Sequence, residues 1–172
     1  GVVGGIFIDM GAPEQAIGYA TKNVDALSAI NVSESEQAKA TMLLAQALYD
    51  HKRYREAEVQ VRRAMTLAKS DDKLILRARM LLAQTLSLSG QMPESERELT
   101  PIEDALKRQA PGPNIVRANA MYLRTQQMIS GNRFDDALLV MHSAIDDAVA
   151  AEGPSKIYTA YPIGRLRWCR IV

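Results

Sequence analysis

Residues 44–64, LAQALYDHKRYREAEVQVRRA, contain the pattern that decides the fold. Ala45 and Ala57 are small residues twelve positions apart, each followed by larger apolar residues at helical spacing. The same spacing recurs at three other places, in the pairs Gly4 with Ala16, Ala83 with Ser95, and Thr125 with Ala137. The first members of these pairs lie roughly forty residues apart, and a period of that size predicts stacked helical hairpins.

Capping and stop signals divide the chain into helices. We expect helices over residues 2–10, 13–29, 34–51, 55–69, 72–89, from Pro93 onward, 114–131, 134–152, and from about 157 to the end. The sequence Ser33-x-x-Glu36 is a capping box, and Asp71 and Asn114 are suited to the same role. Pro101 falls inside the sixth of these helices, so we expect a kink or break at Thr100. No stretch alternates apolar and polar residues for long enough to predict a strand.

Composition narrows the class of protein. The chain has 172 residues, of which 47% are hydrophobic, enough for one domain with a sizeable core. Its net charge of +1 gives no overall field that would attract nucleic acid or an anionic membrane. Cys169 is the only cysteine, which excludes an internal disulfide and favours a reducing, cytoplasmic location. No apolar run has the length of a membrane-spanning helix.

The repeat resembles the tetratricopeptide repeat (TPR), in which small and large apolar residues alternate over a helical hairpin. The clearest copy comprises Leu44, Ala45, Leu48, Tyr54, Ala57, Val61 and Ala64. The next comprises Leu82, Ala83, Leu86, Met92, Ser95, Leu99 and Ile102, and the third Arg124, Thr125, Met128, Phe134, Ala137, Met141 and Ala144. Ile102 stands where the repeat has a small residue, and Arg124 where it has a large apolar one.

The resemblance implies an all-α, right-handed superhelical array of antiparallel hairpins, a solenoid. We expect a single repeat domain over residues 1–172, with repeats at about 1–30, 34–70, 72–110 and 114–153 and a partial copy at 157–172. We interpret the chain as a fragment of a longer protein. The spacing between successive copies is longer than in the common motif. In this respect the chain is similar to the TPR arrays of signalling ATPases, of LuxR-type regulators of the maltose-activator kind, and of kinesin light chains.

In the TPR family, ligands bind the concave face formed by the first helices of successive hairpins. The resemblance therefore implies a ligand groove lined by Met42, Gln46, Tyr49, Met80, Gln84, Tyr122, Gln126 and Arg170. Gln46, Gln84 and Gln126 occupy the same register position, and a primary amide can both donate to and accept from a peptide backbone. Glutamine is also common on exposed helix faces, so a chance ladder is the alternative. The Lys and Asn residues with which some TPR domains grip acidic C-terminal tails are absent from these positions.

The remaining charged residues indicate no catalytic centre. His51 and His142 have no second histidine or cysteine ligand at helical spacing, and no nucleophile, base and oxyanion donor come together. The basic residues cluster at 52–55, 62–63 and 165–170, a pattern typical of a solvated face. Arg77, Arg79 and Arg117 are interpreted as exposed helix residues. We therefore expect no enzyme activity, no metal and no cofactor.

The sequence favours a non-catalytic, protein- or peptide-binding TPR module of a larger regulatory protein or scaffold, such as one that acts in transcription regulation. We expect a protein or peptide partner, no direct contact of this segment with nucleic acid, and no membrane. Three alternatives remain open. They are a structural spacer or self-association domain that uses the repeat ends, a small-effector sensing domain of a transcriptional regulator, and an accessory domain of an enzyme.

Overall fold

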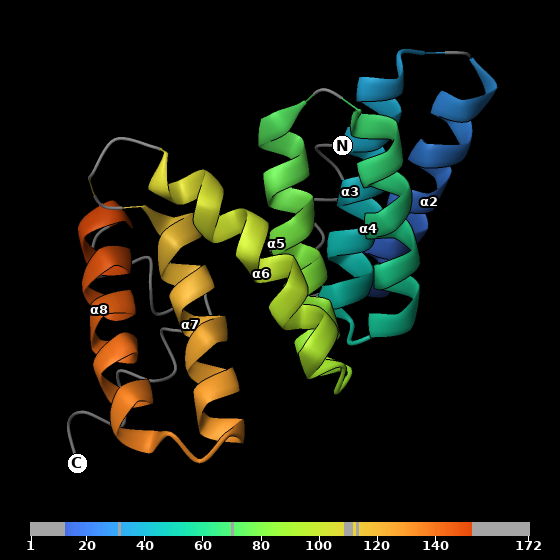
Figure 1. Ribbon diagram of the computed structural model, residues 1–172. Coiled ribbons are helices and arrows are strands. Elements are labelled where there is room, and N and C mark those ends of the chain that lie inside the picture. Colours follow the sequence, from blue (N-terminus) through green and yellow to red (C-terminus); the bar gives the residue numbers. More distant parts are fainter. Residues whose placement is uncertain (1–12, 31, 70, 109–111, 113, 153–172) are drawn as a thin grey trace. The chain divides into compact units, whose positions relative to one another are not determined.

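A computed structural model describes residues 13–30, 32–69, 71–108, 112 and 114–152. Within this part of the chain there are seven α-helices and no strand (Figure 1). The helices are α2 (Pro13–Ala29), α3 (Glu34–Asp50), α4 (Tyr54–Ala68), α5 (Asp72–Leu88), α6 (Met92–Lys107), α7 (Ile115–Ser130) and α8 (Phe134–Glu152). Their bounds agree with the predicted ones to within about two residues. The helices predicted at 2–10 and from 157 lie outside the described residues.

The helix starts follow the predicted capping residues. The Ser33 hydroxyl accepts a hydrogen bond from the backbone N–H of Glu36, and the Asp71 carboxylate accepts one from Leu74. The Asn114 side chain accepts from the second and third residues of α7. Each bond satisfies a backbone donor that has no partner inside the helix, which places the start of the helix at that residue.

The expectation of a kink or break at Thr100 is decided in part. Helix α6 runs from Met92 to Lys107 with Pro101 in its interior, so the break is absent, and the kink stays a prediction. An interior proline costs about 3 kcal/mol through a lost hydrogen bond and a steric clash. Leu99 and Ile102, on either side of it, are fully buried. Burial of two such side chains contributes roughly 1.5–3 kcal/mol each, which is enough to keep the helix continuous.

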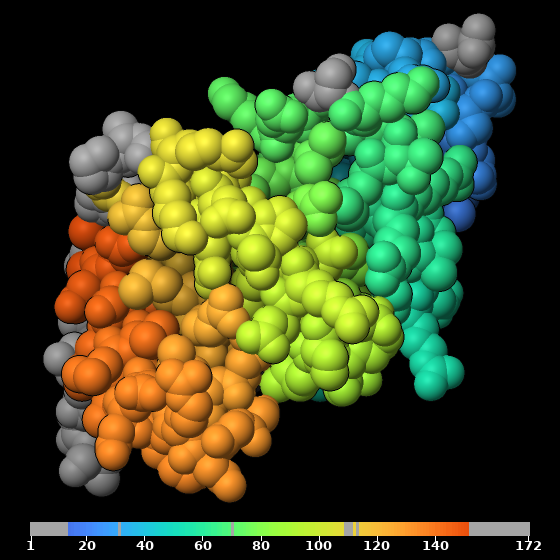
Figure 2. All heavy atoms as spheres, viewed as in Figure 1, coloured from blue at the N-terminus to red at the C-terminus, as the bar shows by residue number. Residues whose placement is uncertain are grey.

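The described helices belong to two compact units, which divide between Glu98 and Leu99. In unit 1, α2 packs on α3, α3 on α4 and α4 on α5, and α3 also touches α5. In unit 2, α7 packs along α8. Within each unit these consecutive helices are thus neighbours in space, as in a helical repeat protein, and Figure 2 shows the side chains on their visible face. The single repeat domain expected over residues 1–172 stays a prediction.

The small residues of the repeated pairs lie in the core. Every described member is buried: Ala16, Ala45, Ala57, Ala83, Ser95, Thr125 and Ala137. The pair Ala83 and Ser95 shows how close the helices come, because the Ser95 hydroxyl on α6 donates to the Ala83 carbonyl on α5 at 2.8 Å. Such a contact between one helix and the backbone of another requires small side chains at the crossing.

Three turns of the chain share one hydrogen-bonding pattern. Each of these turns has one residue with positive φ, namely Lys52 (60°), Gly90 (82°) or Asn132 (58°). In each turn the next residue donates its N–H to a carbonyl five positions earlier, Arg53 to Leu48, Gln91 to Leu86 and Arg133 to Met128. The residue with positive φ donates to the carbonyl three positions before it. This is the Schellman motif, and its recurrence shows that the hairpins α3–α4, α5–α6 and α7–α8 turn in the same way.

The substitution Ala57→Leu should reduce the free energy of unfolding by about 1–3 kcal/mol, because extra methylene groups cannot fit at a close helix crossing. Ala57 is 0% exposed and packs among Ala20, Leu44 and Leu48, which confirms the prediction that it is buried. Ala26→Leu, at an exposed position of α2, is the control and should change stability by less than about 0.5 kcal/mol. Urea denaturation measures both, and equal midpoints would show that the register is wrong.

The turns predict a pair of opposite effects. Lys52→Gly should stabilise the protein by about 0.5–1 kcal/mol, because glycine adopts positive φ without the penalty of a side chain. Gly90→Ala should destabilise it by a similar amount. A Cβ at Gly90 would have no atom within 4 Å, so only the backbone conformation opposes the alanine. Thermal unfolding followed by circular dichroism checks both signs, and a stabilising Gly90→Ala would contradict the explanation.

Candidate functional site

The glutamines of the predicted groove lie on first helices of the hairpins. Gln46 on α3 and Gln84 on α5 are half-buried in unit 1, where these two helices touch. Gln46 donates its side-chain N–H to the Asp50 carboxylate at 3.0 Å. Within the described residues, the Gln84 amide makes no hydrogen bond. The Gln84 side chain therefore keeps its full capacity to donate and accept.

The apolar residues predicted beside the glutamines contribute to the core of unit 1. Met42 and Tyr49 are half-buried and pack against the cluster that joins α3, α4 and α5. The Tyr49 ring meets the Tyr54 ring edge-on, with ring centres 5.8 Å apart. Met80 is buried, with 7% of its surface exposed. A ligand contact at these positions would involve the exposed edges of Met42 and Tyr49 more than Met80.

The other predicted groove residues lie in unit 2 or outside the described part of the chain. Tyr122 packs on Ala118, Ile145 and Ala148, between α7 and α8. Gln126 is half-buried, and its amide makes no hydrogen bond to the described residues. Arg170 lies outside the described residues. The ladder of three glutamines therefore stays a prediction.

Asp50, at the last position of α3, is the titratable group with the most informative surroundings. The residue as a whole is exposed, but neighbouring atoms crowd its carboxyl group. Desolvation raises the pKa of Asp50 above its ordinary value of 3.8, and the hydrogen bond from Gln46 opposes this rise. The pair places an acceptor with restricted hydration next to one of the predicted groove residues.

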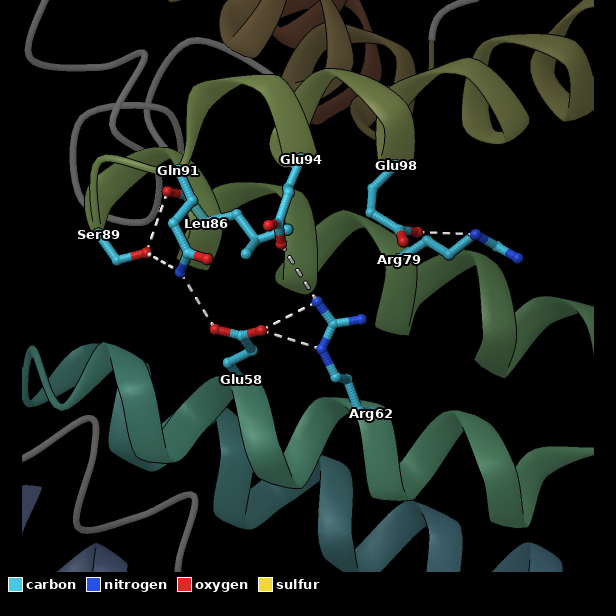
Figure 3. Close-up of polar contacts among 8 residues, drawn as sticks. All are labelled: Glu58, Arg62, Arg79, Leu86, Ser89, Gln91, Glu94 and Glu98. Atoms are coloured by element: carbon cyan, nitrogen blue, oxygen red, sulfur yellow. Dashed lines mark hydrogen bonds and ion pairs between the residues drawn. The ribbon is translucent and has the colours of Figure 1, made fainter.

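Several arginines that were interpreted as solvated are paired with residues of other helices. In unit 1, Arg62 on α4 contacts Glu58 at 2.9 Å and Glu94 on α6 at 3.7 Å, and Gln91 donates to Glu58 (Figure 3). Arg79 on α5 pairs with Glu98 on α6 at 2.7 Å. These contacts bridge α4, α5 and the N-terminal part of α6. The description of Arg79 as an exposed helix residue is therefore corrected.

Unit 2 contains a pocket that the sequence analysis did not predict. Its volume is about 470 Å³. Its lining combines charged and apolar side chains of the C-terminal part of α6, of α7 and of α8: Glu103, Leu106, Lys107, Arg117, Ala120, Met121, Arg124 and Val140. Pockets of this size and mixed character are those that hold small molecules. The one signal in the sequence is Arg124, which departs from the repeat pattern.

Two ion pairs hold the charged side chains of this pocket. Arg124 binds Glu103 through two nitrogen–oxygen contacts of 2.9 and 3.0 Å from the same amino group, and its Nε adds a contact of 3.2 Å. Arg117 meets Asp147 of α8 at 3.5 Å and makes no side-chain hydrogen bond within the described residues. Arg117 is therefore half-buried and paired, which corrects its description as an exposed residue, but its pairing is the looser of the two.

Unit 1 has a pocket of about 430 Å³ between α2, α3 and α4. Ile17, Leu44, Leu48 and Val59 form its apolar part, and Thr21, Arg53, Arg55, Glu56 and Gln60 its polar part. The amide oxygen of Gln60 is buried and accepts no hydrogen bond from the part of the chain that the structure describes. Arg53 and Glu56 bind one another, and Arg55 leaves the lining with a net charge of 2 − 1 = +1.

The described residues contain no group of three or more His, Cys, Asp or Glu side chains that could hold a metal ion. None of the described helices is long and apolar enough to span a membrane. A comparison of the chain with protein-family models, with curated proteins and with solved structures finds no match. Any functional conclusion therefore depends on the geometry of the chain itself.

The raised pKa of Asp50 predicts a pH effect on stability. The folded state holds the Asp50 proton more tightly than the unfolded state, so this group stabilises the fold below pH 3.8 and loses that contribution as pH rises through the raised pKa. Asp50→Asn cannot ionise, so its stability relative to the parent should increase from below pH 3.8 to neutral pH. Denaturant unfolding across this range measures it, with Asp25→Asn on α2 as the charge control. A pH-independent difference would contradict the assignment.

Proposed function

We propose that the chain is a TPR-like solenoid that recognises a protein or peptide without catalysis. The observation that carries this proposal is the recurrence of one hairpin geometry, with the same Schellman turn after α3, α5 and α7. Hairpins that turn alike and stack in order present equivalent side chains in rows. In this proposal the first helices line the concave face, and the chain is a module of a larger regulatory protein in the cytoplasm.

The glutamines at the equivalent positions are the recognition groups in this proposal. Gln84 and Gln126 make no side-chain hydrogen bond to the described residues, and both are half-buried. An amide in this situation can pair with the N–H and C=O groups of a peptide backbone. Exposed edges of Met42 and Tyr49 beside Gln46 add an apolar surface that adapts to different side chains.

A structural spacer that associates with itself is the second candidate, and a patch on α8 favours it. Phe134, Leu138 and Leu139 are exposed on the first turns of this helix, Leu139 by 69% of its surface. Exposed apolar residues gathered on one helix are typical of a protein contact. In this candidate the glutamine row has no part in binding.

Peptide selection on the intact chain tests the first proposal. Peptides are selected from a random displayed library and their affinities are measured by isothermal titration. Gln84→Ala should weaken binding about tenfold, because it leaves polar groups of the bound peptide unpaired at a cost of about 1–3 kcal/mol. The thermal stability of the variant should stay nearly unchanged, since the free side chain is solvated.

Gln15→Ala is the matched control. Gln15 is an exposed glutamine on α2, which is the second helix of its hairpin in the repeat pattern and so is not part of the proposed groove. Its affinity for the selected peptides should equal that of the parent. If Gln84→Ala also binds with parental affinity, the glutamine row is not part of the mechanism. The spacer candidate gains support if the selected peptides lose affinity only when Leu139 is replaced by lysine.

A further inference from the structure

The pocket of unit 2 has two different ends. The C-terminal end of α6, at Lys107, and the N-terminal end of α7, at Ile115, lie near each other in unit 2, and the connection joins them there (Figure 1). Glu103 on α6 and Arg124 on α7 are level with each other because their side chains pair. Towards the connection, Lys107 lines the pocket from α6 one turn away from Glu103, and Arg117 lines it from α7 two turns away from Arg124. The lining on the side of the connection therefore carries two cations, which pair with Asp104 and Asp147, and the rest of its charge is the Glu103–Arg124 ion pair.

The space between these ends is apolar. Leu106, Ala120, Met121 and Val140 line it, from three different helices. Burial of a hydrocarbon body against such side chains removes apolar surface from water and so favours binding. Methionine adapts to apolar partners of varied shape, so the pocket can accept hydrocarbon groups of different shapes. The volume of about 470 Å³ exceeds what a single side chain of a partner would fill.

The charged side chains of the lining determine which polar head group a ligand with a hydrocarbon body would carry. Lys107, Arg117 and Arg124 contribute three positive charges and Glu103 one negative charge, so the lining itself has a net charge of 3 − 1 = +2. Two carboxylates outside the lining pair with it: Asp104 with Lys107 at 3.1 Å, on the exposed surface, and Asp147 with Arg117 at 3.5 Å. Exposed pairs such as Lys107 with Asp104 are weak, and the contact with Asp147 is the one that holds Arg117 among the described residues. A planar guanidinium with donors to spare binds a carboxylate well, and a charge-assisted hydrogen bond is about twice as strong as a neutral one.

The repeat pattern marks the same place. Leu44 and Leu82, at the positions equivalent to Arg124, are buried core residues of unit 1. In unit 2 this position holds an arginine, with 27% of its side chain exposed, and it lines the pocket. A position that breaks a local rule kept elsewhere in the same chain is where a functional constraint is expected.

We propose that this pocket binds a small amphipathic carboxylate. Its carboxylate lies at the connection end, on Arg117 and Lys107, and its hydrocarbon body lies along Leu106, Met121 and Val140. The Glu103–Arg124 ion pair forms the part of the lining farther from the connection. This site lies within unit 2 and does not depend on the glutamine row, so either proposal can fail without the other.

Titration of the intact chain with octanoate, below its micelle concentration, tests the proposal. Octan-1-ol and octylammonium have the same hydrocarbon body with a neutral and a positive head. Two-dimensional amide NMR spectra follow the binding of each. Octanoate should bind about tenfold more tightly than octan-1-ol, and octylammonium should bind most weakly of the three. The amide chemical-shift changes should lie in residues 99–108, 115–130 and 134–152.

Arg117→Gln should weaken octanoate about tenfold and leave octan-1-ol unchanged. Lys107→Gln changes an exposed side chain, so it tests the same point without risk to the fold. Arg108→Gln, next along the chain and outside the pocket lining, removes an equal charge and should leave octanoate binding intact. Equal binding of octanoate and octan-1-ol, equal losses in all three variants, or shifts confined to α2–α5 would each overturn the proposal.

Discussion

The structure depends on the close approach of two helices at a pair of small residues. In the hairpin α5–α6 this approach is close enough for the Ser95 hydroxyl to reach the Ala83 carbonyl of the facing helix. Larger side chains at either position would hold the helices apart and leave voids around the neighbouring leucines. The same requirement explains why Ala57 and Ala137, at equivalent positions, are buried although neither fills much space.

This contact also fixes the length and form of the turn. Partners twelve residues apart leave three residues between the end of one helix and the start of the next, as at 51–53, 89–91 and 131–133. A turn this short must reverse the chain through one residue with positive φ. Glycine fills that place once, at Gly90, and asparagine, which tolerates it, does so at Asn132. Lys52 adopts the same conformation at a cost, because the helix contact leaves no other path.

The sequence predicted the helices well because their determinants are local. A cap such as Ser33 or Asn114 acts within three residues, and the small-residue pairs act within one hairpin. The sequence left open whether Pro101 kinks or breaks α6, because the burial of Leu99 and Ile102 that keeps the helix continuous involves the rest of the fold. The candidate site was predicted less completely. Side-chain pairs such as Arg79 with Glu98 join residues 19 apart on different helices, and no local pattern indicates them.

Arg124 connects the repeat pattern of the sequence with the pocket of unit 2. An arginine in an apolar slot cannot be buried alone, because an unpaired charge in the core costs several kcal/mol. Glu103 supplies its partner from the neighbouring helix, and the side chain of Glu103 stays 33% exposed. A bulky ion pair at the place of a leucine prevents the tight filling seen around Leu82, so a hollow lined by both kinds of side chain follows. The departure from the repeat and the pocket are thus one structural event, and the repeat explains why it occurs in unit 2.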